Sequence, residues 1–289
     1  MAGRTGSTLA EKELRVIKKI CAVVILLALG WWFTRIPSND RQWQPDVAQL
    51  AWAEIDGDRV RLHNVRNFAW GKTEAEFNAR WEDREVKISD IRGIDLFVTH
   101  WGSPWIAHAL VSFDFGENRY VTASIEARKE VGESYSAING FFRQYERIFI
   151  LADERDLIRL RTNVRTDEEV RLYRTRMTPA DSQALFREYL LWMNTARREP
   201  QWYNALVANC TNSYTDFLIA RGIGGVSRWD WRQLANGKGE EMLYELGNFN
   251  APGLSLADLQ QQALIKRRAK DADQAEDFSR RIRVGLPGF

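Results

Sequence analysis

The chain has 289 residues, 45% hydrophobic and 28% charged, and its 41 Lys and Arg nearly balance its 39 Asp and Glu. A formal net charge of +2 gives no argument for binding to nucleic acid, so we expect no nucleic-acid partner. This length and composition predict a globular chain with one large domain or two small ones.

The first predicted element is a membrane-spanning helix near the N-terminus. Basic residues precede a continuous apolar run at 20–33. A helix over that run is about 21 Å long, shorter than the roughly 30 Å hydrocarbon core. Extending it back to residue 16 and placing Trp31 and Trp32 among the headgroups gives an acceptable span at 16–34. A cleavable signal peptide is the alternative, although bulky side chains at 31–33 occupy its expected cleavage site.

The basic residues also predict the orientation of this span. Positive charge stays on the cytoplasmic side, so we expect residues 1–15 in the cytoplasm and the chain after Thr34 in the periplasm or cell exterior. Polar residues at 35–45 form a linker. We place the main domain at 46–250 and a C-terminal helix and tail at 251–289.

Strands dominate the first part of the domain. Period-2 alternation predicts a strand at 59–65 and another at 94–101, with a short helix at 74–83 between them. Further strands, separated by Gly, Asn and Asp turn residues, are predicted at 106–115, 119–126, 147–152, 157–162 and 170–174. Connections this short favour an antiparallel sheet.

Two helices are predicted after these strands. Thr178 is an N-cap candidate with Pro179 at the first helical position, and apolar spacing continues to about residue 196. Asn209 can cap a second helix that ends just before Gly222. On that helix Cys210 shares one face with apolar side chains, which directs its thiol toward the sheet.

An amphipathic helix is predicted near the C-terminus. Ser255 and Asp258 form a capping box at its start. Its apolar residues repeat through Leu264, and its end is basic at 266–270. Such a helix could lie on anionic lipid or pack on the domain with its basic end in water.

Cys210 is the one cysteine outside the apolar N-terminal segment. A lone thiol in an oxidising compartment cannot form an intramolecular disulfide, so it is either buried and inert or reactive. A cysteine nucleophile acts as the thiolate, which a helix N-terminus and a nearby imidazole both favour. The predicted helix start supplies the first feature, and a histidine would supply the second.

Three histidines, His63, His100 and His108, are available to act as a base. Alternate residues from Ala109 onward form an apolar face, so His108 lies on the opposite face with Ser112, where a packed helix could meet it. His100 precedes a turn, and His63 faces away from the apolar side of its strand. A structural role is the alternative for each. Cys210 at a helix start and His108 at a strand start have the papain-like layout.

Ordered motifs in the chain resemble those of the periplasmic domain of the Lnb-type bacterial lipoprotein N-acyltransferases. The matching blocks lie between residues 43 and 247, and they are Ala107-His108-Ala109-Leu110-Val111-Ser112-Phe113, Ser124-Ile125-Glu126-Ala127-Arg128, Tyr135, Gly140-Phe141-Phe142-Arg143-Gln144-Tyr145-Glu146, Asp153-Glu154-Arg155-Asp156, Leu160-Arg161, Trp202-Tyr203-Asn204 and Asn209-Cys210-Thr211. The chain has Asn212 where many members have a second Thr after the last motif. That difference affects capping more than chemistry.

The resemblance implies an α+β fold of the permuted papain-like, NlpC type, in which the histidine strand precedes the cysteine helix. It also implies that Cys210 is the nucleophile and His108 its base. The mechanism then needs an oxyanion donor, for which Asn209 and Tyr203 are candidates. It needs as well an acceptor that orients the histidine, with Ser124, Glu126 or a backbone carbonyl as candidates.

The charged blocks around Arg128, Glu146, Arg155 and Arg161 allow two interpretations. They could bind a polar headgroup or an amino terminus, or they could form structural ion pairs and solvated faces. Three scattered histidines and one external cysteine lack the spacing of metal ligands, so we expect no metal and no other cofactor.

We therefore expect a single-pass protein of the bacterial inner membrane that transfers acyl groups through a Cys-His pair. Membrane lipid and lipoprotein N-termini are the expected partners. Two alternatives remain open at this stage, an amidase or peptidase that acts on cell-wall peptide, and a non-catalytic scaffold domain in which Cys210 is buried.

Overall fold

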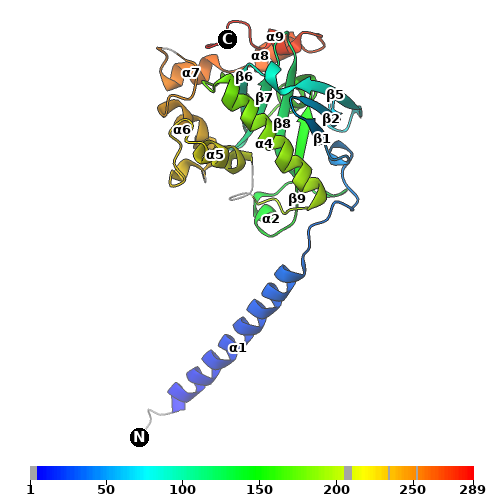
Figure 1. The fold of residues 1–289 in the computed structure, drawn as a ribbon. Helices are drawn as coiled ribbons and strands as arrows, with labels where there is room; N and C mark the ends of the chain where they lie inside the picture. The colour runs from blue at the N-terminus through cyan, green and yellow to red at the C-terminus, as the bar shows by residue number, and fades with distance from the viewer. Residues whose placement is uncertain (1–4, 205–209, 234, 252) are drawn as a thin grey trace. The chain divides into compact units, whose positions relative to one another are not determined.

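The computed structural model describes residues 5–204, 210–233, 235–251 and 253–289. The chain divides into two compact units, Met1–Ser38 and Asn39–Phe289. The first unit consists mainly of helix α1 (Thr5–Thr34) (Figure 1). Within the described segments α1 is the one helix long and apolar enough to cross a membrane, with a mean hydropathy of 2.0 in an 18-residue window within Glu11–Thr34.

A mixed sheet forms the centre of the second unit (Figure 1). Its strands in spatial order are β1 (Trp52–Asp56), β2 (Arg59–Arg66), β9 (Glu146–Ala152), β8 (Tyr120–Arg128), β7 (Ala107–Asp114), β6 (Gly93–His100) and β10 (Glu169–Arg174), and β5 (Trp81–Lys87) also pairs with β2. Neighbours are antiparallel except β2 and β9, which pair in parallel where Arg66 lies opposite Ala152. The prediction of a wholly antiparallel sheet is wrong there, because it rests on short turns between consecutive strands, and β2 and β9 are neighbours in the sheet that no short turn connects.

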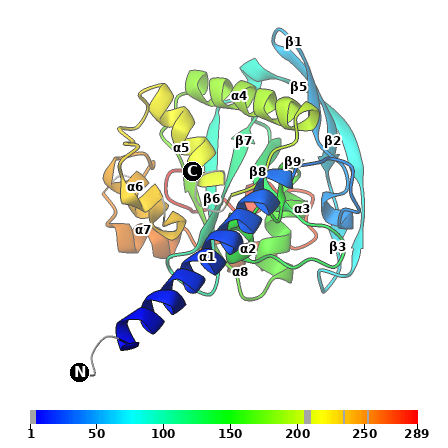
Figure 2. The same cartoon turned by 90° about the horizontal axis from the view of Figure 1, so that it is seen from below.

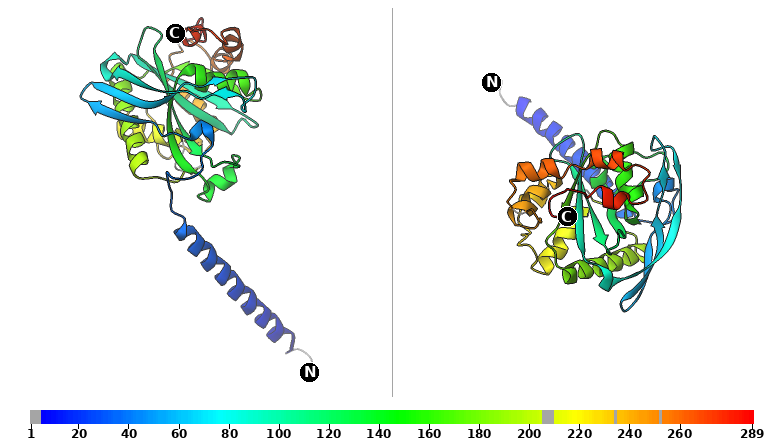
Figure 3. Two further views of the ribbon diagram at one scale, coloured as in Figure 1. Left: turned by 90° about the vertical axis from the view of Figure 1, so that its right-hand side faces the viewer. Right: turned by 90° about the horizontal axis from the view of Figure 1, so that it is seen from above.

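Helices cover both faces of this sheet (Figures 2 and 3). On one face α4 (Pro179–Arg198) and α5 (Cys210–Ala220) pack against the odd-numbered side chains of β7, such as Val111 and Phe113. On the other face α3 (Glu154–Arg159), α8 (Lys266–Asp271) and α9 (Phe278–Arg281) enclose a second core around Leu110. The strand period of two therefore divides β7 between two cores.

Helices α4 and α5 begin where the sequence predicts. Thr178 caps α4 by accepting a hydrogen bond at its Oγ1 from the backbone N–H of Asp181 at 3.1 Å. Helix α5 begins at Cys210, and Gly222 follows its end with a φ of 65°, in the left-handed region that favours glycine. Asn209, the predicted cap of α5, lies outside the described residues.

The short helix predicted at 74–83 is wrong. The segment forms β4 (Phe77–Asn78), which pairs with β3 (Ala69–Trp70), and the start of β5. Phe77 stacks on Phe68 with ring centroids 5.2 Å apart, and Trp81 meets the same ring edge-on at 5.0 Å. This aromatic cluster and the pairing of β5 with β2 hold the segment extended, so tertiary contacts override the local pattern.

The strand predicted at 157–162 is also wrong. Residues Glu154–Arg159 form α3, and a π-helical turn follows at Leu160–Val164. The Asp153 side chain caps α3 by accepting a hydrogen bond from the backbone N–H of Arg155 at 3.0 Å. Because residues 156–162 are all buried, their pattern has neither a period of 2 nor one of 3.6.

The predicted C-terminal amphipathic helix is two helices, α7 (Leu256–Gln262) and α8, packed on the domain. Ser255 caps α7 as predicted, accepting from the Asp258 N–H at 3.2 Å. The helix breaks between α7 and α8 because the backbone there forms hydrogen bonds with strand β10. The Leu172 N–H donates to the Ala263 carbonyl at 2.9 Å, and the Ile265 N–H donates to the Val170 carbonyl at 3.1 Å. A helix α6 (Gly239–Glu245) precedes this segment.

Candidate functional site

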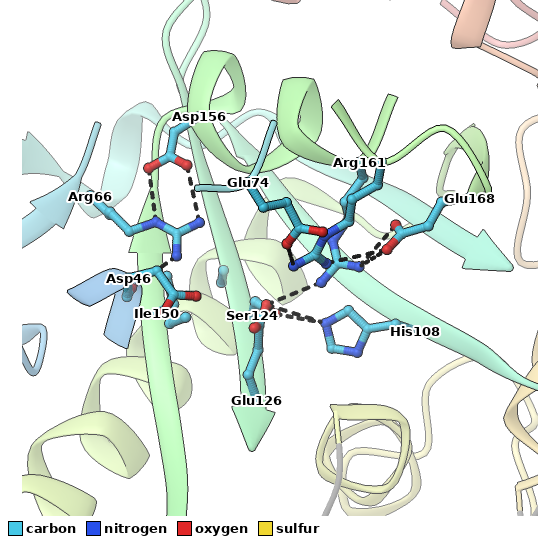
Figure 4. A network of polar contacts seen from close by, with 12 residues as sticks. Asp46, Arg66, Glu74, His108, Ser124, Glu126, Ile150, Asp156, Arg161 and Glu168 are labelled. Carbon is cyan, nitrogen blue, oxygen red and sulfur yellow. Dashed lines mark hydrogen bonds and ion pairs between the residues drawn. The ribbon is translucent and has the colours of Figure 1, made fainter. Parts of the chain in front are cut away.

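His108 lies near the start of β7, on the face opposite Ala109, as the alternation predicts. Its side chain is buried, and its Nε2 lies 2.8 Å from the Ser124 Oγ of the neighbouring strand β8 (Figure 4). The β7–β8 ladder ends with Val111 opposite Ala123, so His108 lies beyond the last pair, at the start of β7, while Ser124 lies in the middle of β8, where it pairs with Ile150 of β9.

Ser124 and Glu126 hold the imidazole at its Nε2. The Ser124 hydroxyl donates its one proton to Glu126 Oε1 at 2.8 Å. It must therefore accept from His108, so Nε2 of the imidazole carries a proton. Glu126 Oε1 also lies 3.6 Å from Nε2, close enough to stabilise an imidazolium. The two side-chain candidates for orienting the histidine, Ser124 and Glu126, thus both lie beside it.

Glu126 is held as a carboxylate. Arg161 donates to its Oε1 at 3.3 Å and to Glu168 Oε2 at 3.1 Å, so one guanidinium connects two carboxylates (Figure 4). Burial raises the pKa of the Glu126 carboxyl, but the contact with His108 and the charge of Arg161 outweigh burial and hold that pKa well below the usual glutamate value.

Two tyrosines from the helices hold β8 beside the histidine. The Tyr189 hydroxyl of α4 lies 2.8 Å from the carbonyl oxygens of both Ser124 and Ile150 and donates its proton between them. The Tyr214 hydroxyl of α5 donates to the Ala123 carbonyl at 3.3 Å. Helical spacing identifies both rings as core residues, but it carries no signal for the partners of their hydroxyl groups.

His108 opens into a cavity of about 360 Å³, here called the His108 cavity. Glu126, Arg161 and Tyr203 also line it. Tyr203 is held beside the residue that precedes β9, because its N–H donates to the Tyr145 carbonyl at 2.9 Å. The candidate oxyanion donor Tyr203 and the base therefore border one space.

Cys210 is the first residue of α5, and its side chain lies outside what the structure describes. Helix α5 contacts β7 and β8 on the face opposite His108, and the helix that covers the His108 face is α3. The two candidate catalytic residues therefore come from the two sides of the sheet.

The four charged residues predicted to bind a polar ligand lie in different places. Arg128 is buried and donates to the carbonyls of Val47 and Ala48 at 3.0 and 2.8 Å. Glu146 is buried and pairs with Arg41 at 2.9 Å. Arg155 pairs with Asp153 at 3.2 Å. Arg161 lines the His108 cavity.

The other two histidines lie elsewhere. His63 stacks on Trp52 with ring centroids 3.9 Å apart, and its Nδ1 is 2.8 Å from Asp83 Oδ2. His100 Nε2 lies 3.4 Å from Glu240 Oε1, beside a separate cavity. Over the described ranges no three His, Cys, Asp or Glu side chains gather as metal ligands would.

Comparison with known proteins identifies the domain. The family model of the Lnb N-terminal periplasmic domain matches residues 77–237, more than half of the 289 residues. No curated protein and no solved structure matches the chain. A periplasmic domain family together with one apolar N-terminal helix describes a single-pass membrane protein with a periplasmic domain. The chain belongs to the family of the Lnb N-terminal periplasmic domain.

Proposed function

We propose that the protein is a thiol acyltransferase anchored in the bacterial inner membrane, with a cytoplasmic N-terminus. Cys210 is the nucleophile and His108 the base, in a permuted papain-like arrangement with the histidine strand ahead of the cysteine helix. The observation that carries the proposal is the contact of His108 Nε2 with Ser124 and Glu126. It leaves Nδ1 as the nitrogen that takes a proton from a thiol.

In the first half-reaction His108 Nδ1 takes the proton of the Cys210 thiol. The thiolate attacks the carbonyl carbon of an ester, and its electron pair forms the S–C bond while the carbonyl oxygen becomes an oxyanion. When the C–O bond breaks, the imidazolium returns its proton to the leaving alcohol. An acyl-thioester remains on Cys210, and Glu126 stabilises the imidazolium throughout.

In the second half-reaction an amine attacks the thioester carbonyl. His108 takes a proton from the nitrogen and the Cys210 thiolate leaves, so an amide forms. The backbone N–H of Cys210 at the start of α5 is suited to hold the oxyanion, with Tyr203 or Asn209 as the second donor. The anchor places this chemistry beside phospholipid esters and lipoprotein amines, which are the proposed donors and acceptors.

Mass spectrometry of the intact, membrane-purified protein tests the proposal. We expect an acyl chain on Cys210 that hydroxylamine removes, because hydroxylamine cleaves thioesters readily. Cys210→Ser should lose this labile adduct, and His108→Ala should slow its formation by about 10²–10⁴-fold. Cys21→Ser and His63→Ala are the matched controls and should keep it, since Cys21 lies in α1 and His63 stacks on Trp52.

Two other results would contradict acyl transfer. If Cys210→Ser and His108→Ala both fully complemented a deletion strain, the site would not be catalytic. If the purified protein hydrolysed soluble muropeptides and never carried an acyl group, the chemistry would be that of a peptidase or amidase.

A further inference from the structure

A second cavity, here called the apolar cavity, lies between the sheet and helices α5 and α6. Its volume is about 90 Å³, and its walls include Leu96, Val98, Ala109, Val111, Met242 and Leu243. An engineered apolar cavity of about 150 Å³ stays dry and binds benzene. A space of this size and lining therefore suits a short run of methylene groups better than water.

The apolar cavity adjoins the His108 cavity. Ala107 and Asn236 line both of them, and Ala107 immediately precedes His108. Thr211, which immediately follows Cys210, is buried and lines the apolar cavity. Each of the two proposed catalytic residues thus has its chain neighbour in the wall of this cavity.

Three of the polar side chains in the wall have hydrogen-bond partners within the protein. Glu240 accepts a hydrogen bond from the Tyr173 hydroxyl at 2.8 Å. Thr215 donates to the Thr211 carbonyl at 3.0 Å, and Asn248 Nδ2 donates to the Gly224 carbonyl at 3.0 Å. These groups are already satisfied, so the cavity selects for apolar volume and not for a hydrogen-bonding ligand.

We infer that the apolar cavity is the acyl-chain subsite, which takes the methylene groups next to the carbonyl that Cys210 attacks. The substrate class is therefore a fatty acyl ester. A chain bound through sulfur at the start of α5 enters the cavity past Ala107 and Thr211. Each methylene group moved from water into the cavity favours acylation about fourfold. This inference rests on the proposed function.

Two substitutions change the volume of the cavity in opposite directions. Ala109→Leu fills it from β7, and Met242→Ala enlarges it from α6, where the Met242 side chain is fully buried. Met193→Ala is the matched control, because Met193 is buried in the same core but does not line the cavity. Thermal unfolding of each variant checks that it is folded, and Ala109→Leu is the variant that adds to the packing and removes none.

The measurement is the rate at which nitrophenyl acetate, butanoate and octanoate acylate Cys210 in the detergent-solubilised full chain. We expect Ala109→Leu to lower the octanoyl-to-acetyl rate ratio by about tenfold or more, Met242→Ala to raise it, and Met193→Ala to leave it unchanged. Acylation of Cys210 with the same ratio in all four proteins would overturn the subsite alone. If no ester acylated Cys210 in the unaltered protein, the proposed function would fall.

Discussion

At the scale of single residues, the Ser124 hydroxyl connects the base to its carboxylate, because it accepts from His108 and donates to Glu126. Ser124→Ala should lower kcat about 10–100-fold with little change in KM, since the orientation and basicity of the imidazole are lost and substrate contacts are kept. Ser124→Thr keeps the hydroxyl and should restore most of kcat. The rate of Cys210 acylation measures both effects.

Ser112→Ala provides the control for this prediction. Ser112 is also a buried serine on the same face of the sheet, but it donates to Glu154 at 2.5 Å and not to the histidine. We expect Ser112→Ala to lower the free energy of unfolding by about 1–3 kcal/mol with kcat unchanged. Equal losses of kcat in Ser112→Ala and Ser124→Ala would show that Ser124 acts through stability and not through the base.

Some of the site could be predicted from the sequence. The period of two along a strand places Ser124 and Glu126 on one face, so both could be proposed as partners of a histidine on the next strand. The contact of Arg161 with Glu126 could not, because Arg161 lies in a π-helical turn that the sequence presents as a strand. The Tyr189 hydroxyl reaches Ser124 between distant elements, and a single sequence carries no signal of that pairing.

At the scale of elements, tertiary contacts decide the secondary structure of short segments more than their own sequence pattern does. The residues at 157–162 are buried on every side, so alternation could not separate a helix from a strand. The better local signal was Asp153, which begins an acidic first turn in front of them. Longer elements with an exposed face, such as α4 with its Thr178 cap, were predictable because only one side is apolar.

Asp153 is therefore a test of what starts α3. It caps the helix, and its carboxylate also pairs with Arg84 at 2.9 Å and with the Arg155 side chain at 3.2 Å. Asp153→Ala loses the cap and both ion pairs, and should cost about 1 kcal/mol for the cap and up to about 1 kcal/mol for each pair. Asp153→Asn keeps the cap, since asparagine serves there as well as aspartate, and should lose only the ion pairs. Thermal unfolding of the three proteins measures these differences.

The same residue predicts a pH dependence. Burial raises the pKa of the Asp153 carboxyl, but Arg84 and the backbone N–H of Arg155 lower it by more, so that pKa is depressed in the folded protein. The stabilisation from the carboxylate is then present above the unfolded-state pKa of about 3.9 and is lost as the pH falls through the folded value. The difference in stability between the unaltered protein and Asp153→Asn should therefore shrink in acid. A difference that stayed constant down to acid pH would mean that this charge adds nothing to stability.

At the scale of the whole molecule, the C-terminal segment belongs to the same compact unit as the site. The family match ends at residue 237, whereas the unit continues to Phe289. The segment is fixed by Arg283, which is buried just after α9. Its guanidinium donates to Asp95 Oδ2 at 2.8 Å and to both Glu154 oxygens at 2.7 and 2.8 Å. It also lies over the Tyr120 ring at 3.7 Å.

Removing this guanidinium leaves two buried carboxylates without their shared cation. We therefore expect Arg283→Ala to lower the free energy of unfolding by about 3–5 kcal/mol. Arg283→Lys should restore little of the lost free energy of unfolding, because one ammonium cannot reproduce the planar guanidinium that reaches Asp95 and Glu154 together. Urea unfolding of the full chain, followed by tryptophan fluorescence, measures both losses.

The pH dependence of this loss separates the charge from simple packing. Burial raises the pKa of Asp95 to about 6 even with two arginines beside it, and without Arg283 that pKa rises further. The folded variant then binds protons more tightly than its unfolded chain, so it gains stability as the pH falls. The free energy of unfolding of Arg283→Ala should therefore fall furthest below that of the unaltered protein at neutral pH, and the difference should be smaller below about pH 6.

Arg281→Ala, which removes a more exposed arginine of α9, is the control. Its free energy of unfolding should stay within about 0.5 kcal/mol of that of the unaltered protein at every pH. If Arg283→Ala matched that control, the C-terminal segment would be held by its apolar contacts and not by this arginine.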